Sequence, residues 1–294
     1  MMYNNVKAKH LGGGVVLFEN TLELDWDWMF NFCKEIVDKE SAEMYTLTTH
    51  PHTGEPAYVN KSGYYFDKKS IEEMPGRGLG LHRDARFQSI KTLAFIEEVK
   101  YQCLLKYMEL FPLVYKCIWW KSKGHISHYK KGMYLGPHSD VSSDYIYGVP
   151  PSKNQLALKN MVGIIVYVND SVDELSEGSK DFIGGDHYFD YLDIRYKPKK
   201  GDILMFPSNY MAAHRIEPVL DGNRYAYLGW YCHGSPNQSL GEIVHDPLLE
   251  PDAAISKENL YLPFLRQDFQ DYLLKNGHDK NSFAYSITVR MEQD

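Results

Sequence analysis

Two histidines and one aspartate have the residue types and the spacing of a metal site. His138 and Asp140 are two residues apart, so on an extended strand both side chains point to the same face. His214 follows 74 residues after Asp140. Two imidazoles and one carboxylate are a ligand set that holds a non-haem iron on one side and leaves other coordination positions open. The sequence therefore predicts an iron site made by these three residues.

An arginine and a tyrosine lie close to these ligands in the sequence. Arg224 comes ten residues after His214, and Tyr129 comes nine residues before His138. The planar guanidinium of arginine suits a carboxylate, and a tyrosine hydroxyl adds a further hydrogen bond. Strand alternation places Arg224 on the same face as Trp230. A site with iron at one end and Arg224 with Tyr129 at the other would bind a small dicarboxylate by both ends.

The elements that must position these residues begin with helices. Apolar residues at helical spacing predict a first helix capped by Asp25 and a second over residues 88–110, which Pro112 ends. Residues 47–88 are rich in Gly, Pro, His and charge, and we expect a loop there with a short strand near Tyr64. Short apolar runs between turn signals predict strands at residues 15–18, 117–120, 125–129, 161–168, 187–189, 202–206, 213–219 and 224–231.

This pattern predicts a mainly β fold with flanking helices, an α+β protein with a sandwich or jelly-roll core. Residues 1–235 are expected to form one domain, with N-terminal helices and a β core over about 115–232. Residues 236–294 are expected to form a helical extension that packs on the core. One helix there would begin at Pro263, with Leu265, Phe269 and Leu273 on its apolar face.

Composition excludes several classes of protein. The chain of 294 residues has 32 Lys and Arg against 39 Asp and Glu, a formal charge of −7, which disfavours binding to nucleic acid or to an anionic membrane. No apolar run has the 18 residues that a membrane span needs, and residues 1–7 have no apolar signal core. The four cysteines are scattered. We therefore expect a cytoplasmic protein without disulfides, and its oligomeric state stays open.

In their order and spacing, these motifs resemble those of the prolyl-4-hydroxylase-like branch of the Fe(II)/2-oxoglutarate-dependent dioxygenases. The resemblance covers about residues 115–232. The matching positions are Tyr129, Gly132, His138 with Asp140, Tyr167-Val168-Asn169, Gly184-Gly185, Lys200-Gly201-Asp202, Phe206-Pro207, His214, Pro218-Val219, Arg224 and Trp230.

The resemblance implies a double-stranded β-helix, the cupin-like jelly roll, with a site at its mouth. His138, Asp140 and His214 would bind Fe(II), and these ligands with Arg224 would be the catalytic set. Arg224 and Tyr129 would hold the distal carboxylate of 2-oxoglutarate, with Trp230 also beside the co-substrate. O2 is the second co-substrate, and ascorbate is an optional reductant. The carboxylate of Asp140 favours hydroxylation over halogenation.

Two features concern the surroundings of the site. After Gly184-Gly185 the family often has Glu-Thr, whereas this chain has Asp186-His187. His187 is open to three interpretations, as a fourth ligand, a residue of the pocket wall or a surface residue. Residues 141–160 include Tyr145 and Tyr147, and we expect this segment to fold over the substrate as a lid.

Three functions compete at this point. The first is hydroxylation of a prolyl or similar aliphatic carbon in a peptide or protein. The second is oxidation of a free amino acid or another small metabolite, which the same iron site would serve equally well. The third is a binding module that keeps the jelly roll without catalysis. The presence of His138, Asp140, His214 and Arg224 argues against the third.

Overall fold

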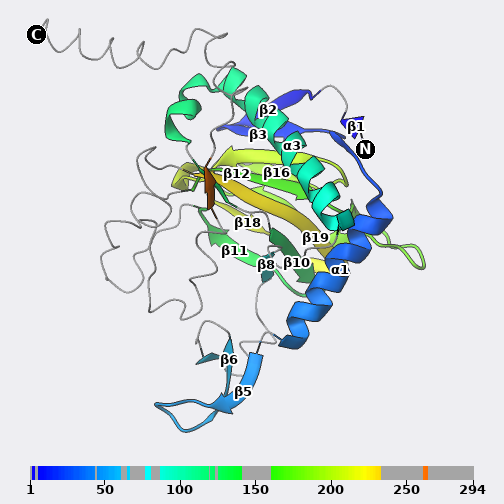
Figure 1. Cartoon of the computed structure of the whole chain (residues 1–294), viewed down its shortest axis with the longest axis vertical. Coiled ribbons are helices and arrows are strands. Elements are labelled where there is room, and N and C mark those ends of the chain that lie inside the picture. Colours follow the sequence, from blue (N-terminus) through cyan, green and yellow to red (C-terminus); the bar gives the residue numbers. More distant parts are fainter. Residues whose placement is uncertain are drawn as a thin grey trace, which may run out of the picture. The chain divides into compact units, whose positions relative to one another are not determined.

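The computed structural model describes residues 2–3, 6–43, 45–60, 65–66, 77–80, 87–118, 120–122, 125–140, 160–232 and 261–263. The chain divides into two compact units, Met1–Leu262 and Pro263–Asp294. The described residues belong almost entirely to the first unit, and they hold both helices and all the strands discussed below (Figure 1).

Two helices pack on the outer face of the long strand β19 (Val219–Cys232). Helix α1 (Trp26–Glu43) begins where expected, because the Asp25 carboxylate accepts a hydrogen bond from the Trp28 amide. Its Phe30 ring contacts the Tyr225 ring edge-on, with centroids 5.2 Å apart. Helix α3 (Phe87–Leu110) approaches the same strand through a hydrogen bond from the Tyr227 hydroxyl to Glu97. No helix of the described residues is long and apolar enough to cross a membrane.

The larger sheet has eleven strands, with β19 at its centre. Its main path runs β13-β14-β19-β12-β17-β3-β2, and β10, β8, β9 and β20 join at the side. All pairs with β19 are antiparallel. The bounds of these strands are β2 (Ala8–Gly12), β3 (Val15–Phe18), β8 (Arg77–Gly80), β9 (Trp120–Ser122), β10 (His125–Lys130), β12 (Asn160–Tyr167), β13 (Ser171–Val172), β14 (Phe182–Gly184), β17 (Ile203–Pro207) and β20 (Tyr261–Pro263).

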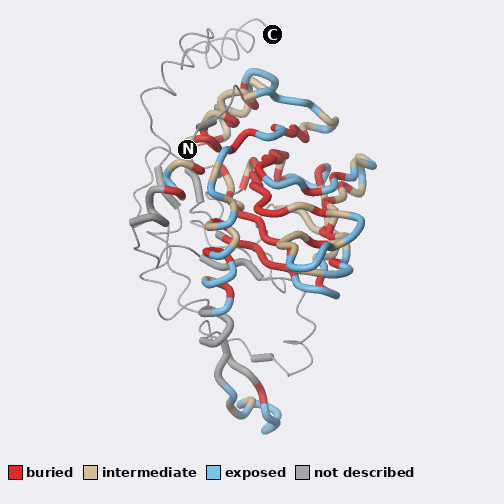
Figure 2. Tube along the Cα trace, turned by 90° about the vertical axis from the view of Figure 1, so that its right-hand side faces the viewer, coloured by how far each residue is buried: buried red, intermediate tan, exposed pale blue. Residues whose placement is uncertain are grey.

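A smaller sheet of four strands completes the sandwich. Its order is β11-β18-β15-β16, with bounds β11 (Leu135–His138), β18 (His214–Ile216), β15 (His187–Phe189) and β16 (Ile194–Tyr196). Buried residues follow the strands of the core (Figure 2). One core cluster joins Tyr167, Phe206 and Ala226 of the larger sheet to Phe189 and Tyr196 of the smaller one. This two-sheet arrangement confirms the expected jelly roll, and it buries one face of each sheet against the other.

Two expectations for the N-terminal half were wrong in part. The region expected to be mostly loop contains a three-stranded sheet of β5 (Tyr45–Thr49), β6 (Pro56–Asn60) and β7 (Tyr65–Phe66), in addition to β8. Its strands have only two to five residues, and turn residues separate them, so each gives a weak signal in the sequence. The run at residues 117–120 is not one strand either. A 3-10 helix, η1 (Pro112–Cys117), which Pro112 begins, occupies its start, and β9 follows.

Three expectations fall largely outside the described residues. The lid residues Tyr145 and Tyr147 lie there, and so do residues 236–260 and 264–294 of the expected helical extension. Within that extension the structure describes only β20, whose backbone pairs with β9. A domain boundary at residue 235 and a helical C-terminal extension therefore remain predictions.

The Lys200-Gly201-Asp202 turn fastens the N-terminal strands to the core. The buried carboxylate of Asp202 accepts a hydrogen bond of 2.7 Å from the Asn20 amide and one of 2.6 Å from the Tyr196 hydroxyl. Asn20 belongs to the turn after β3, and Tyr196 ends β16. The Asp202 side chain thus connects the turn after β3 to both sheets.

We expect Asp202→Ala to lower the free energy of unfolding by about 1–3 kcal/mol, because it leaves the Asn20 amide and the Tyr196 hydroxyl without their acceptor. Denaturant titration followed by circular dichroism measures the change. Asp173→Ala is the matched control, since the Asp173 carboxylate is exposed and pairs with Lys197 at the surface. Equal stability of the two variants would contradict this role of Asp202.

Candidate active site

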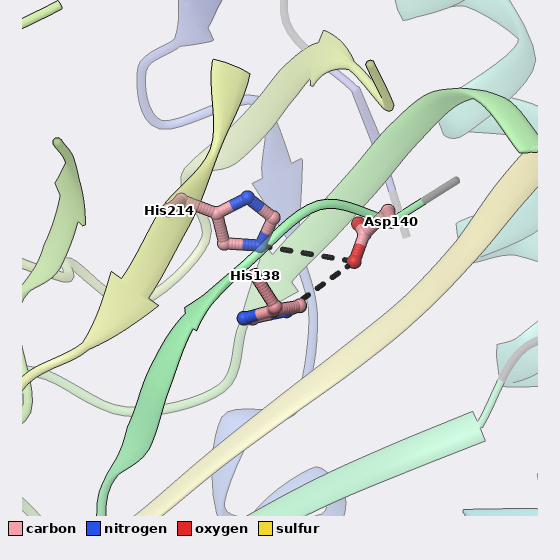
Figure 3. Close-up of side chains that lie close together, drawn as sticks. All are labelled: His138, Asp140 and His214. Atoms are coloured by element: carbon pink, nitrogen blue, oxygen red, sulfur yellow. Dashed lines mark ion pairs between the residues drawn. The ribbon is translucent and has the colours of Figure 1, made fainter. Parts of the chain in front are cut away.

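The register of two neighbouring strands brings the three predicted ligands together. His138 ends β11 and lies opposite His214, which begins β18. Asp140 follows β11 and turns its carboxylate toward both rings (Figure 3). The Asp140 Oδ1 atom is 3.4 Å from His138 Nε2 and 3.8 Å from His214 Nε2. One donor atom from each residue lies within 4.8 Å of the others, which is the spacing that a single metal ion requires.

Backbone carbonyls orient both imidazoles. His138 Nδ1 is 2.9 Å from the Gly136 carbonyl oxygen, and His214 Nδ1 is 3.1 Å from the Ala212 carbonyl oxygen. A carbonyl only accepts hydrogen bonds, so each Nδ1 carries the proton and each Nε2 keeps its lone pair. Both lone pairs are therefore available for a metal ion on the side of Asp140.

The carboxylate of Asp140 is held by neighbours on the larger sheet. The indole N–H of Trp230 donates a hydrogen bond of 2.9 Å to Asp140 Oδ2, and the Asn160 side chain donates to the Asp140 carbonyl oxygen. Gly163 makes room for this contact, because a Cβ there would lie 3.1 Å from Asp140 Oδ2 and 2.8 Å from the Phe206 ring. These contacts leave Oδ1 facing the two imidazoles.

The charges of the triad are coupled. Burial acts to raise the pKa of Asp140, but its interactions with His138, His214 and Trp230 outweigh burial and lower it. Burial lowers the pKa of His214, and Asp140 opposes this only in part. At His138 burial is outweighed by the Asp140 carboxylate and the Gly136 carbonyl, and the pKa rises. The site is thus a carboxylate between two imidazoles that differ in basicity.

Arg224 lies deeper between the sheets, directly across from Tyr129. The two residues are register partners on β19 and β10, and the guanidinium carbon is 5.2 Å from the centre of the Tyr129 ring. Arg224 is only 1% exposed, and its Nε and Nη2 atoms have no hydrogen-bond partner among the described residues. Gly185 makes this position possible, since a Cβ there would lie 3.0 Å from the Arg224 side chain.

Tyr167 and His187 line the space beside Arg224. The Arg224 guanidinium lies 5.4 Å from the centre of the Tyr167 ring, and the Tyr167 hydroxyl is 3.2 Å from His187 Nδ1. His187 is fully buried, with its ring 4.7 Å from that of His214. Burial, with the nearby His214 and Arg224, keeps the pKa of His187 well below its ordinary value. His187 is therefore a neutral histidine inside the sandwich.

Most of the predicted site residues lie at two places between the sheets. The three ligands share one location, and Arg224 and Tyr129 share another between the same sheets. Trp230, which is expected beside the co-substrate, donates a hydrogen bond to the candidate ligand Asp140. His187 lies against His214 as part of the wall, and among the described residues the possible metal group contains only His138, Asp140 and His214.

Sequence reasoning did not assign a role to several residues that shape the site. In the sequence Tyr167 is only one residue of a motif, whereas in the structure its hydroxyl contacts His187 and its ring lies beside Arg224. Gly163 and Asn160 carried no signal of their own, because their roles depend on β12 passing directly beside Asp140. The alternation of β12 was the one available signal, since it places Gly163, Ile165 and Tyr167 on one face.

The donor set fits Fe(II), and the unpartnered arginine fits an anion. Two imidazole nitrogens and one carboxylate oxygen on one side of a metal ion are typical of non-haem Fe(II) sites with open positions. A buried guanidinium without a partner is costly, and a carboxylate would satisfy its fork with two parallel hydrogen bonds. This arrangement can hold a metal ion and, beside it, a small carboxylic acid such as 2-oxoglutarate.

Comparison with known proteins points to the same chemistry. The family model of the 2OG-Fe(II) oxygenase superfamily matches residues 124–232. A PKHD-type hydroxylase of Idiomarina loihiensis is 32% identical over 123 residues, which are 41% of this chain and 47% of the relative. The match therefore spans about half the length of that curated relative.

Among solved structures, the chain is similar to two prolyl hydroxylases. The viral collagen prolyl hydroxylase of Paramecium Bursaria Chlorella virus-1, in its 2OG complex, has a TM-score of 0.45 at 15% identity, over 76% of this chain and 98% of that one. A prolyl-4-hydroxylase of Pseudomonas putida has a TM-score of 0.42 at 15% identity, over 76% and 94%.

The matched segment contains the whole candidate site, from Tyr129 to Trp230, and the description of its family names the iron and the co-substrate for which the side chains are arranged. Residues 124–232 are thus similar in sequence to the 2OG-Fe(II) oxygenase superfamily.

Proposed function

We propose that this protein is an Fe(II)- and 2-oxoglutarate-dependent oxygenase that hydroxylates an unactivated aliphatic C–H bond. One observation carries the proposal, namely that a triad of two histidines and an aspartate lies between the same two sheets as a buried arginine with unpartnered nitrogens. A metal site alone would fit many proteins. A metal site accompanied by a buried carboxylate receptor fits a metal-bound dicarboxylate.

Different side chains would bind the metal and orient its ligands. His138, Asp140 and His214 would hold Fe(II), with their free lone pairs directed by the Gly136 and Ala212 carbonyls. Asp140 is fixed by Trp230, so the carboxylate needs little reorganisation when the metal binds. Three protein ligands leave the remaining coordination positions for the co-substrate and oxygen.

Arg224 would bind the distal carboxylate of 2-oxoglutarate, with Tyr129 across from it. The burial of this pair excludes water and strengthens the ion pair. When bound, Fe(II) and 2-oxoglutarate supply the oxidising chemistry: the substrate C–H bond, O2 and 2-oxoglutarate become C–OH, succinate and CO2. The protein's own contribution is to place the substrate carbon beside the iron.

For the substrate, we propose a prolyl or similar aliphatic residue in a peptide or protein. The resemblance of the motifs to the prolyl-4-hydroxylase-like branch supports this class, and the matched relative from Idiomarina loihiensis is itself named a hydroxylase. A free amino acid or other small metabolite is the second candidate. A cytoplasmic location also remains a proposal. It is compatible with the free thiols of Cys33, Cys103 and Cys117, the cysteines whose pairing the structure describes.

The first test is turnover. Purified protein with Fe(II), 2-oxoglutarate and O2 is expected to form succinate, and more of it with a true substrate than without one. A panel of proline-containing peptides and free amino acids, followed by mass spectrometry, should show a gain of one oxygen atom in one class. Asp140→Ala is the control, because it removes the only carboxylate ligand. Succinate formation by that variant at the wild-type rate would contradict the proposed metal site.

Trp230→Phe tests the support of the metal ligand. The substitution keeps most of the aromatic area but removes the N–H that holds Asp140 Oδ2, so we expect the affinity for Mn(II), used in place of Fe(II), to fall by about 10–100-fold. Calorimetric titration measures this. Trp28→Phe is the matched control, since Trp28 stacks on Phe32 of α1 far from the triad in the sequence. Unchanged Mn(II) affinity in Trp230→Phe would refute the role of the indole.

Arg224→Leu separates co-substrate binding from metal binding. We expect the dissociation constant for 2-oxoglutarate to rise roughly 100-fold, because two hydrogen bonds to a charged group are lost, while Mn(II) affinity stays the same. Arg195→Leu is the control, as Arg195 lies at the surface and pairs with Glu217. Equal losses of metal and 2-oxoglutarate binding in Arg224→Leu would show that the arginine only supports the fold.

A further inference from the structure

We infer that His187 is a further co-substrate-binding residue, whose Nε2–H donates a hydrogen bond to the distal carboxylate of 2-oxoglutarate beside Arg224. This inference rests on the proposed function. It assigns a role to the position where the chain departs from the Glu-Thr that its family often has after the two glycines.

The strand register places His187 beside the candidate ligand His214, and Tyr167 connects His187 to the arginine. On paired strands β15 and β18, Phe189 lies opposite His214, and His187 lies opposite Ile216. His187 is therefore one inward-facing position further along the sheet than the metal ligand His214. In the larger sheet, Tyr167 reaches the same level, since its hydroxyl contacts the His187 ring.

The surroundings of His187 leave one of its nitrogens without a partner. Its ring stacks on Phe189 with centroids 4.8 Å apart and meets the Phe206 ring edge-on at 5.5 Å. The side chain is 0% exposed, and its Nε2 atom has no hydrogen-bond partner among the described residues. A buried polar atom without a hydrogen-bond partner lowers the stability of the fold. Such an atom beside a binding site therefore indicates a hydrogen bond to a ligand.

The proposal places the proton of His187 on Nε2. The Tyr167 hydroxyl is 3.2 Å from His187 Nδ1. The Arg224 guanidinium, which only donates, lies 5.4 Å from the centre of the same tyrosine ring. When Tyr167 donates to Nδ1, the neutral imidazole carries its proton at Nε2. The orphan atom is a donor in this arrangement.

Three donors without partners thus meet in one part of the sandwich. They are His187 Nε2, Arg224 Nε and Arg224 Nη2, and Tyr167 links the two residues. A carboxylate has two oxygens with about four acceptor sites, which is enough for all three donors. As a donor, Nε2 has no lone pair for iron, and His187 is absent from the group of possible metal ligands among the described residues. The interpretation as a fourth ligand is therefore not favoured.

Calorimetric titration of the full chain, loaded with Mn(II), tests this assignment. His187→Leu removes the donor and keeps an apolar side chain of similar volume. We expect its dissociation constant for 2-oxoglutarate to rise at least roughly tenfold, the loss of one hydrogen bond to a charged group. His187→Gln places an N–H donor near the former Nε2 position and should recover most of the affinity.

A second ligand shows which end of the co-substrate is contacted. In 2-oxopentanoate a methyl group replaces the distal carboxylate, while the metal-binding 2-oxo acid end is unchanged. We expect wild type and His187→Leu to bind this compound equally. Circular dichroism and Mn(II) affinity, both expected to be unchanged, show that the variants are folded and hold the metal. If His187→Leu does not fold, His187→Gln and His187→Asn give the same comparison, because asparagine lacks the reach of Nε2.

The outcomes separate the two proposals. A loss confined to 2-oxoglutarate and reversed by glutamine supports the assignment. Unchanged 2-oxoglutarate binding in His187→Leu, or an equal loss for both ligands, would overturn it while leaving the proposed function intact. Failure of the wild-type protein itself to bind 2-oxoglutarate would overturn the proposed function, and the role of His187 with it.

Discussion

A positive charge buried between two sheets is the constraint on which this structure depends. Arg224 is 1% exposed, and two of its nitrogens have no partner in the described chain. Taking a guanidinium out of water costs several kcal/mol unless an anion compensates it. The remaining parts of the site surround this charge: Gly185, which leaves room for the side chain, aromatic rings that exclude water, and the candidate metal triad, which would lie near the other end of a bound dicarboxylate.

The precision of the site comes from pairs of neighbours, each with a single task. Gly136 and Ala212 carbonyls direct the imidazoles, and Trp230 and Asn160 hold Asp140. None of these partners would bind the metal itself. Their effect is to fix the lone pairs of the ligands before the metal arrives, so that little conformational freedom is lost on binding.

Several motif residues lie outside the site and hold the fold that makes it. The Asn169 side chain accepts from the Tyr225 amide and donates to the Lys180 and Asn223 carbonyls, which joins the ends of three chain segments. Asp202 fastens the N-terminal hairpin. The motif of this chain thus contains two kinds of residue, those placed to contact a ligand and those that fix the register of the strands. The spacing in the sequence does not distinguish them, and the hydrogen bonds do.

The sequence alone was enough to propose the ligand triad and the arginine with its tyrosine, and to predict both helices and most strands of the core. These follow from local rules, because alternation fixes the face of a strand residue and helical spacing with a capping aspartate fixes a helix. The contacts of His187 and Tyr167, and the oxygen of Asp140 that faces the imidazoles, depend instead on how the two sheets pack. Tyr167 of β12 reaches His187 of β15 across the sandwich and lies beside Arg224 of β19. Contacts between residues distant in the chain leave no periodic trace in the sequence, so they are visible only once the sheets are packed.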